Sequence, residues 1–232
     1  SSGGAFMYHA ENNEVYIGLI TDLNYSNPHV SPFEEFQRWK THPKTAKYLK
    51  GAERLAYGAR ALAKGGLNSL PKMNFPGGLI IGCDAGTLNA VKIKGNHTAM
   101  KSGILAAEEV AAALMSETPA TDLVGFEQRV ADSWLGKELK ASRNFAGYMH
   151  TFGALLGSAA VWFDQTIMRG NMPFTLRDKK PDYACLKPAA SSKKIDYPKP
   201  DNVLTFDRLS SVFLSNTNHE EDQPCHLQLV DT

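Results

Sequence analysis

The chain has 232 residues with 25 basic and 24 acidic side chains, so its formal net charge at pH 7 is +1. This balance creates no field that would attract a nucleic acid, and we expect none as a partner. The length allows a sizeable core in one or two domains. The three cysteines, Cys83, Cys185 and Cys225, are scattered and form no C-x-x-C spacing, which favours a reducing compartment over a disulfide framework.

The first twenty residues predict a β-hairpin. Two β-rich runs, residues 5–8 and 15–20, are separated by the turn-prone residues 11–13. Gly3 and Gly4 precede the first run. Such a pair most often provides a flexible or twisted strand entry, but its bare backbone also lets a flat ring approach the N–H and C=O groups.

Residues 31–43 predict a short helix. Ser31 suits the N-cap and Glu34 completes a capping box, while the pair His42-Pro43 ends the helix. The aromatic side chains of this segment are more easily explained as core residues than as cofactor contacts: Phe33, Phe36 and Trp39.

Two further strands are predicted over residues 53–62 and 67–73, joined by Lys64-Gly65-Gly66. Arg60 lies on the first of them, where a solvated arginine is more common than one that contacts a ligand oxygen.

The most informative stretch is residues 77–103. A short apolar run, residues 79–81, predicts a buried strand, and the turn that follows places Asp84 at its carboxyl end. A helix with small and apolar faces is predicted from about His97. Asp84 could accept hydrogen bonds from a ribityl or ribose hydroxyl, while the free helix N–H groups meet a pyrophosphate or an electron-rich ring. The alternative is an ordinary strand-turn-helix with a solvated Asp84.

Residues 123–137 predict an amphipathic surface helix, and the next segment changes character. Residues 144–163 contain no Asp, Glu, Lys or Arg, and their length is at the limit for crossing a bilayer, which takes about 20 residues. His150 and Ser158 interrupt the apolar run, and Arg143 and Arg169 flank it. Three alternatives remain: a buried core helix, a spanning helix, and a segment that dips into one leaflet. Three aromatic residues suit an interfacial position: Tyr148, Trp162 and Phe163.

The last fifty residues predict little regular structure. Residues 181–200 are rich in Pro, Lys and Ser, which is typical of an extended connector. The following NHEEDQP cluster suggests a metal site at first sight. Its candidate ligands have no recognised spacing, so we prefer a polar loop: His219, Glu220, Glu221, Asp222 and His226.

Several of these strings resemble one family. The order of residues 77–103 is similar to the second FAD fingerprint of glutathione-reductase-type flavoproteins, with a cysteine between Gly82 and Asp84. The longer string IGCDAGTLNAVKIKGNHTAMKSGILAAE, residues 81–108, resembles the electron-transfer flavoprotein–ubiquinone oxidoreductase family, as do GGAFMYH and SPFEEFQRWKTHP. The resemblance extends over nearly the whole chain and is weakest over residues 120–144.

The resemblance implies an α+β fold, with part of a glutathione-reductase-type FAD-binding domain, a β-sheet quinone-binding domain and a helical membrane-contacting segment. The implied boundaries are 1–75 for the quinone-binding sheet, 76–116 for the FAD-binding part and 117–180 for the helical segment, with its membrane contact at 144–168. Residues 181–232 would form a connector and the start of an iron–sulfur, ferredoxin-like domain.

The resemblance also implies an electron path from reduced electron-transfer flavoprotein through FAD and a [4Fe–4S] cluster to ubiquinone in the respiratory chain. FAD would contact Gly82, Asp84 and Gly86, and ubiquinone would contact Gly3 and Gly4. The cofactors carry the redox chemistry, so we name no catalytic side chain and no metal ligand in this chain. The cluster ligands are expected beyond Thr232, since four thiolates are needed and three cysteines are present.

The sequence contains no G-x-G-x-x-G turn for the pyrophosphate and does not begin with Met, so we expect a fragment that lacks both ends and is inactive alone. The resemblance implies a peripheral or monotopic protein of an inner membrane. It would lie on the matrix face in mitochondria or on the cytoplasmic face in bacteria. Two alternatives are a related FixC-like dehydrogenase or geranylgeranyl reductase, and a non-catalytic membrane-associated fragment.

Overall fold

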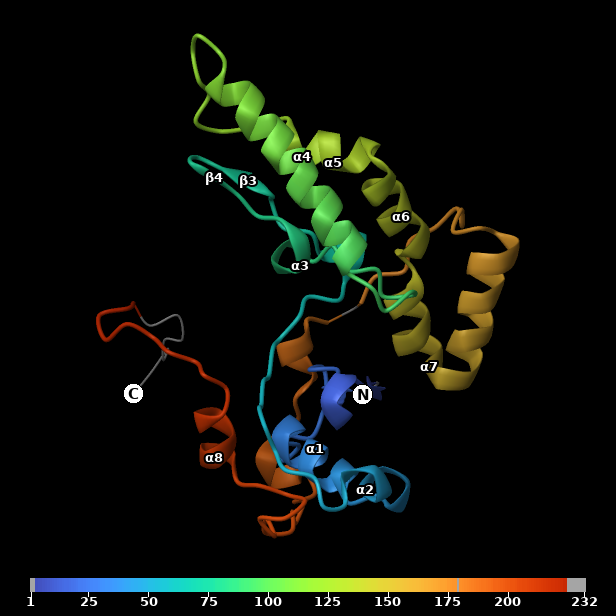
Figure 1. The fold of residues 1–232 in the computed structure, drawn as a ribbon. Helices are drawn as coiled ribbons and strands as arrows, with labels where there is room; N and C mark the ends of the chain where they lie inside the picture. Colours follow the sequence, from blue (N-terminus) through green and yellow to red (C-terminus); the bar gives the residue numbers. More distant parts are fainter. Residues whose placement is uncertain (1–2, 179, 225–232) are drawn as a thin grey trace. The chain divides into compact units, whose positions relative to one another are not determined.

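A computed structural model describes residues 3–178 and 180–224 of the chain. The described residues up to Arg60, together with those from Lys180 onward, form unit 1, and those from Ala61 to 178 form unit 2. Helices and two small antiparallel sheets occur along the chain (Figure 1), so at this level the expected α+β class is confirmed.

Unit 1 begins with the predicted hairpin. Strands β1 (Gly3–His9) and β2 (Val15–Thr21) pair in antiparallel register, with Gly3 opposite Thr21 at the open end. The 3-10 turn η1 (Glu11–Asn13) joins them, and both of its asparagines adopt positive φ, a conformation that asparagine tolerates better than most residues. The prediction of a hairpin is therefore confirmed.

In addition to η1, the described residues of unit 1 form the helices α1 (Pro32–Lys40), α2 (Pro43–Leu49) and α8 (Arg208–Phe213) and the 3-10 turns η4 (Asp182–Cys185) and η5 (Ala189–Ser191). Ser31 caps α1 as predicted, because its Oγ accepts the Glu34 N–H at 3.3 Å. The other half of the capping box is replaced, since the Ser31 N–H donates to Tyr197 Oη. Pro43 ends α1 and also starts α2, a helix that the sequence reasoning missed.

The prediction of two strands over residues 53–62 and 67–73 is wrong. Residues 52–65 have no regular structure, and residues 66–69 form the 3-10 turn η2 (Gly66–Ser69). The segment is rich in alanine and glycine, which are weak strand formers, and Leu55 and Leu62 remain exposed. The strands in this region come later, as a short hairpin of β3 (Asn74–Phe75) and β4 (Gly78–Leu79). Only the first residue of the apolar run at 79–81 therefore belongs to a strand.

The core of unit 2 is formed by the helices α3 (Gly82–Ala85), α4 (Asn96–Leu114), α5 (Phe126–Asp132) and α6 (Trp134–Ser142). The helix predicted from about His97 is confirmed as α4. Ser133 divides the predicted amphipathic helix into α5 and α6, because its Oγ accepts the Leu135 N–H and caps the second helix. The buried core combines these helices with the preceding loop: Met73, Ala85, Leu105, Ala106, Phe126, Val130, Leu135 and Leu139.

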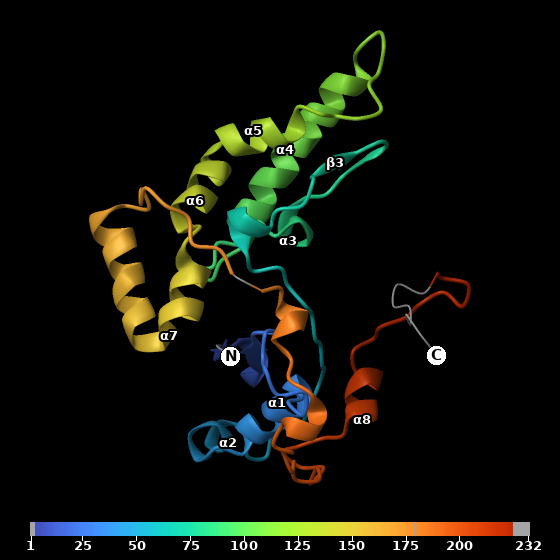
Figure 2. The ribbon, with the colours of Figure 1, turned by 180° about the vertical axis from the view of Figure 1, so that it is seen from behind.

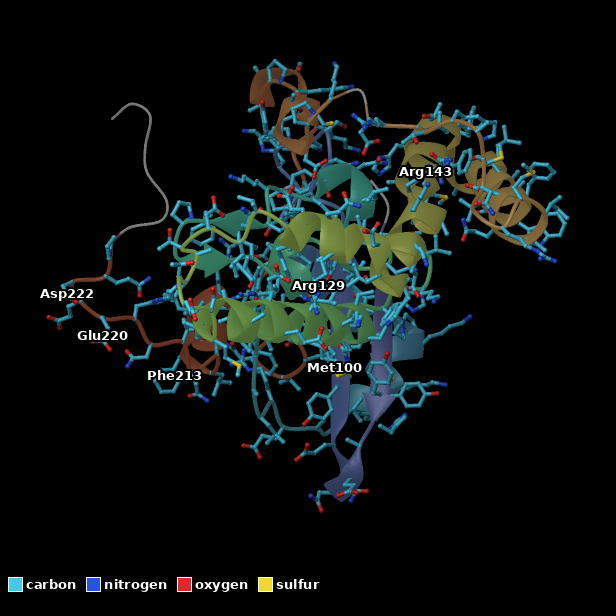
Figure 3. All side chains as sticks on the ribbon, turned by 90° about the horizontal axis from the view of Figure 1, so that it is seen from above. Met100, Arg129, Arg143, Phe213, Glu220 and Asp222 are labelled. Atoms are coloured by element: carbon cyan, nitrogen blue, oxygen red, sulfur yellow. The ribbon has the colours of Figure 1, made fainter. Side chains whose placement is uncertain are left out.

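Ion pairs hold α4 against α5. The Arg129 guanidinium lies between these helices (Figure 3), where it donates to Glu108 and to Glu109, the latter at 2.8 Å. The pKa of Arg129 is raised, chiefly by the hydrogen bond to Glu109. The pair adds polar support at the edge of the apolar core.

The charge-free segment forms α7 (Phe145–Trp162), a bent helix followed by one π turn, η3 (Phe163–Ile167). Gly153 has φ 71° and ψ −174°, which breaks the helix into two arms. The arms run side by side in both views (Figures 1 and 2), and a Cβ on Gly157 would lie 2.8 Å from the Tyr148 carbonyl oxygen. In the described part of the chain, none of the helices has the length and apolarity needed to cross a membrane.

Candidate functional site

The predicted flavin-binding residues lie together in one tight turn of unit 2. Gly82 adopts φ 65°, and its buried N–H donates to Ser102 Oγ of α4 at 2.9 Å. Gly86 ends α3 in the left-handed region, with its N–H bonded to the Cys83 carbonyl. Asp84 therefore lies in the single turn of α3, not directly at the end of a strand, and its side chain is exposed. Both glycines shape the turn, and Asp84 is the group that faces outward.

The N-terminus of α4 adjoins this turn. Its N-cap, Gly95, provides no side-chain cap, so the N–H groups of the first helical turn keep their capacity to meet an acceptor. A Cβ on Gly95 would lie 3.1 Å from Cys83 Sγ, which places α3 directly beside the helix end. Thr87, next to Gly86, is fully buried, and its Oγ1 has no hydrogen-bond partner among the described residues. An exposed carboxylate, an uncapped helix end and an orphaned hydroxyl fit a ligand with both hydroxyl and acceptor groups, as FAD has.

A cluster of polar side chains around Glu138, which the sequence reasoning missed, attaches the loop between α3 and α4 to α6. Glu138 of α6 accepts from His97 Nε2 at 2.7 Å, from Lys92 Nζ at 2.8 Å and from Asn89 Nδ2 at 2.9 Å. His97 also stacks on Trp134, with ring centroids 5.9 Å apart. No short motif marks Glu138, because its partners lie more than 40 positions earlier in the chain.

Gly3 and Gly4, the predicted quinone contacts, differ in the space around them. A Cβ on Gly3 would lie 2.2 Å from the Ile20 carbonyl oxygen, so Gly3 is required by the close approach of β2. A Cβ on Gly4 would meet no atom of the described residues within 4 Å. Gly4 is therefore the position where a bare backbone is not explained by packing.

Elsewhere in unit 1, the N-terminal segment is joined to residues 205–214. Arg54 donates to Ser211 Oγ at 2.7 Å and lies 4.0 Å over the ring of Phe206. Lys40 Nζ lies 4.9 Å from the centroid of the same ring. Burial, with repulsion from Arg54, lowers the pKa of Lys40 to about 8. Two cations on one aromatic ring make this contact specific, and it connects segments about 150 positions apart.

The two arms of α7 and the turn η3 form a helical hairpin, residues 145–167, which we call the α7 hairpin. Arg143 lies at its base, where the chain enters and leaves the hairpin. Figure 3 places it where α6 ends and α7 begins. Its guanidinium donates to the carbonyls of Gly170, at 2.8 Å, and of Met172, and its Nε donates to Thr175 Oγ1 at 3.1 Å. Asn144 is buried and bonds both Phe174 and Leu176. The chain that leaves the hairpin is thereby tied to the chain that enters it.

Asp164 is the one carboxylate enclosed at this base among the residues that the structure describes, being 1% exposed. Its Oδ1 has no hydrogen-bond partner in the part of the chain that the structure describes. Burial raises the pKa of Asp164, while Arg143, Asn144 and Tyr148 act in the opposite direction. The charged form is therefore poorly compensated.

We expect Asp164→Asn to stabilise unit 2 at neutral pH by about 1 kcal/mol, because a neutral amide of the same shape replaces a poorly paired buried charge. Because the pKa of Asp164 is raised in the folded state, the unsubstituted protein has its full stability below the unfolded pKa of about 4. It loses part of that stability as pH rises through the folded pKa of Asp164. The advantage of the variant should therefore grow from pH 4 to pH 7. Urea unfolding of both proteins across that range measures it, and a difference that shrinks with pH would contradict the raised pKa.

The site residues thus divide between the units, with Gly82, Asp84 and Gly86 in unit 2 and Gly3 and Gly4 in unit 1. Groups of three or more side chains able to hold a metal ion are not found within residues 3–178 and 180–224. Cys83 and Cys185 are free thiols in different units, and Cys225 and His226 lie outside the described residues. A four-thiolate cluster does not fit the cysteines of this chain alone.

Comparison with known proteins identifies both ends of the chain. Residues 1–62 match the family model described as "ETF-QO, ubiquinone-binding". Residues 202–232 match the model described as "Electron transfer flavoprotein-ubiquinone oxidoreductase, 4Fe-4S". The two matched segments include the partners that meet at Phe206 in unit 1.

Curated relatives match the whole chain. The electron transfer flavoprotein-ubiquinone oxidoreductase of Pseudomonas aeruginosa is 62% identical over 232 residues, which cover 100% of this chain and 42% of the relative. The human mitochondrial protein of the same name is 48% identical over 240 residues, covering 99% of this chain and 38% of the relative. The chain spans about two fifths of the length of the relatives it matches. Family models at both ends and this identity throughout show that the chain belongs to the electron transfer flavoprotein–ubiquinone oxidoreductase family.

Proposed function

We propose that this chain provides the ubiquinone-binding segment, part of the FAD site and the membrane contact of an electron-transfer flavoprotein:ubiquinone oxidoreductase. The observation that carries the proposal is the pair of family models, one for ubiquinone binding and one for a 4Fe-4S segment, on a chain 62% identical to a relative of that name. Electrons would enter from reduced electron-transfer flavoprotein and leave to ubiquinone.

The residues of unit 2 have a binding role in this proposal. FAD, when bound, supplies the chemistry that accepts and passes on electrons. The Asp84 carboxylate would accept hydrogen bonds from hydroxyls of its ribityl chain, and the uncapped first turn of α4 would face acceptor atoms. Gly82 and Gly86 keep the turn tight, so that a ligand approaches the backbone closely. A side-chain acid or base is not needed for these tasks.

The α7 hairpin would bind a membrane without crossing it. Its bend at Gly153 returns the chain to its starting point, and Arg143 ties the two ends together. Large apolar side chains are exposed along the hairpin and the turn after it: Phe152, Leu155, Leu156, Trp162, Phe163 and Ile167. Such a surface suits insertion into one leaflet, with the polar base in the head-group region. This arrangement would keep both flanks on one face of an inner membrane, where the lipid-soluble quinone is reached.

The quinone assignment predicts that Gly4→Leu impairs ubiquinone reduction by at least tenfold, because a bulky side chain would fill space that a flat head group needs. The test uses a chimera in which this chain replaces the matching segment of the Pseudomonas relative. The β1–β2 hairpin should keep its stability, since a Cβ at Gly4 has no neighbour within 4 Å among the residues that the structure describes.

Gly58→Leu is the matched control, because a Cβ at Gly58 also has open space around it, with no described atom within 4 Å. Flavin reduction by electron-transfer flavoprotein should be unchanged in both variants. Equal loss of flavin reduction and quinone reduction in Gly4→Leu would point to misfolding and contradict the assignment.

A further inference from the structure

Glu138 connects two parts of unit 2 that the proposed flavin site needs in fixed positions. Its partners Asn89 and Lys92 belong to the loop that leaves Gly86, and His97 belongs to the first turn of α4. The Glu138 side chain is 17% exposed and lies on α6, a helix anchored in the core by Leu135 and Leu139. The Glu138 carboxylate therefore joins α6 to the segment that runs from Asp84 to the N-terminal end of α4.

The loop of residues 87–95 is also shaped by hydrogen bonds among its own residues. Asn89 Oδ1 accepts the N–H groups of Val91 and Lys92, and the Asn89 and Lys94 backbones bond to each other. These contacts are internal to the loop and do not fix it to the rest of the unit. Asn89 is itself 3% exposed, so its amide is held between the loop and Glu138. Glu138 is the point at which this folded loop is attached to α6.

The charge of Glu138 is maintained by its partners. Burial opposes ionisation, but hydrogen bonds from Lys92, His97 and Asn89 outweigh it and lower the pKa of Glu138 to about 2. The carboxylate is therefore ionised throughout the neutral range and can accept from all three donors at once. A glutamine at this position would keep the shape but would present an NH₂ group to donors.

We propose that Glu138 is the positioning residue of the FAD site: it holds Asn89, Lys92 and His97 so that the loop of residues 87–95 and the α4 N-terminus keep the shape that FAD requires. The residue acts through these partners and does not touch the ligand. The inference rests on the proposed FAD site at Asp84 and the α4 N-terminus. It assigns a role to α6, which contains none of the residues predicted for that site.

The test uses the Pseudomonas chimera with Glu138→Gln. FAD affinity should fall about tenfold or more, and the absorption spectrum and midpoint potential of the remaining bound flavin should shift, because the loop no longer holds one conformation. Glu117→Gln is the matched control, since Glu117 is exposed and undergoes the same chemical change. That control should bind FAD like the unsubstituted chimera.

A second variant separates positioning from folding. His97→Phe keeps a ring against Trp134 but removes the donor to Glu138, so it should weaken FAD binding in the same direction even if Glu138→Gln fails to fold. Amide exchange of residues 89–97 should be faster in each folded variant. Unchanged FAD affinity, spectrum and potential in both would overturn the inference while leaving the FAD site intact. A chimera that binds no FAD before any substitution would overturn the proposed function, and this inference with it.

Discussion

Arg143→Met should destabilise the α7 hairpin by about 2–4 kcal/mol and abolish its attachment to lipid vesicles. The loss follows from the number of partners, because one guanidinium bonds the carbonyls of Gly170 and Met172 and the hydroxyl of Thr175. Hydrogen bonds from a charged donor are worth about 1.5–3 kcal/mol each, but they share one side chain and do not add fully. Methionine fills similar volume without any donor, so the two ends of the hairpin would separate.

Lys140→Met is the control for this prediction. Lys140 lies in the last turn of α6, just before Arg143, and is exposed, so the substitution removes one positive charge but none of the hydrogen bonds that Arg143 donates. Vesicle flotation and limited proteolysis within residues 144–175 measure the two effects. If the Arg143→Met variant floated with vesicles and resisted protease as well as the Lys140→Met variant does, Arg143 would not be the residue that holds the two ends of the hairpin together.

Asp84→Ala should reduce FAD affinity by about tenfold to a hundredfold in the Pseudomonas chimera. A carboxylate that accepts a ligand hydroxyl makes a charge-assisted hydrogen bond, which is stronger than a neutral one. The substitution should leave the fold unchanged, because Asp84 is exposed and the turn is held by Gly82, Gly86 and Ser102. Equilibrium dialysis of FAD, with thermal unfolding as the folding check, measures both quantities.

Asp182→Ala provides the matched control for Asp84→Ala. Asp182 is also an exposed aspartate in the first turn of a very short helix, but it lies in unit 1. Its removal should not change FAD affinity. If Asp84→Ala also retained full FAD affinity, the assignment of Asp84 would be wrong even though the family is established.

The features that sequence reasoning predicted are those encoded locally. The hairpin follows from two β-rich runs around an asparagine-rich turn, and the start of α1 follows from Ser31 and Pro32. The helix after Asp84 follows from its small and apolar residues. In each case the residues that determine the structure are within a few positions of it.

The features that sequence reasoning missed depend on distant residues. The strand predicted over residues 53–62 would need a partner strand, and the described part of the chain provides none for this segment. The bend of α7 depends on one glycine, Gly153, among several similar ones in the same run. Glu138 and Arg54 look like ordinary surface charges until the fold brings their partners to them from 41 and 157 positions away, respectively.

The central claim is that this chain completes an enzyme that passes electrons through a flavin to ubiquinone, and the flavin spectrum of the Pseudomonas chimera in lipid vesicles tests it most directly. Reduced electron-transfer flavoprotein, added without oxygen, should bleach the flavin absorbance of the purified chimera. Ubiquinone added next should restore that absorbance, and Gly4→Leu should slow only this second step. A folded chimera that contains no flavin, or whose flavin is reduced but is not reoxidised by ubiquinone, would contradict the claim.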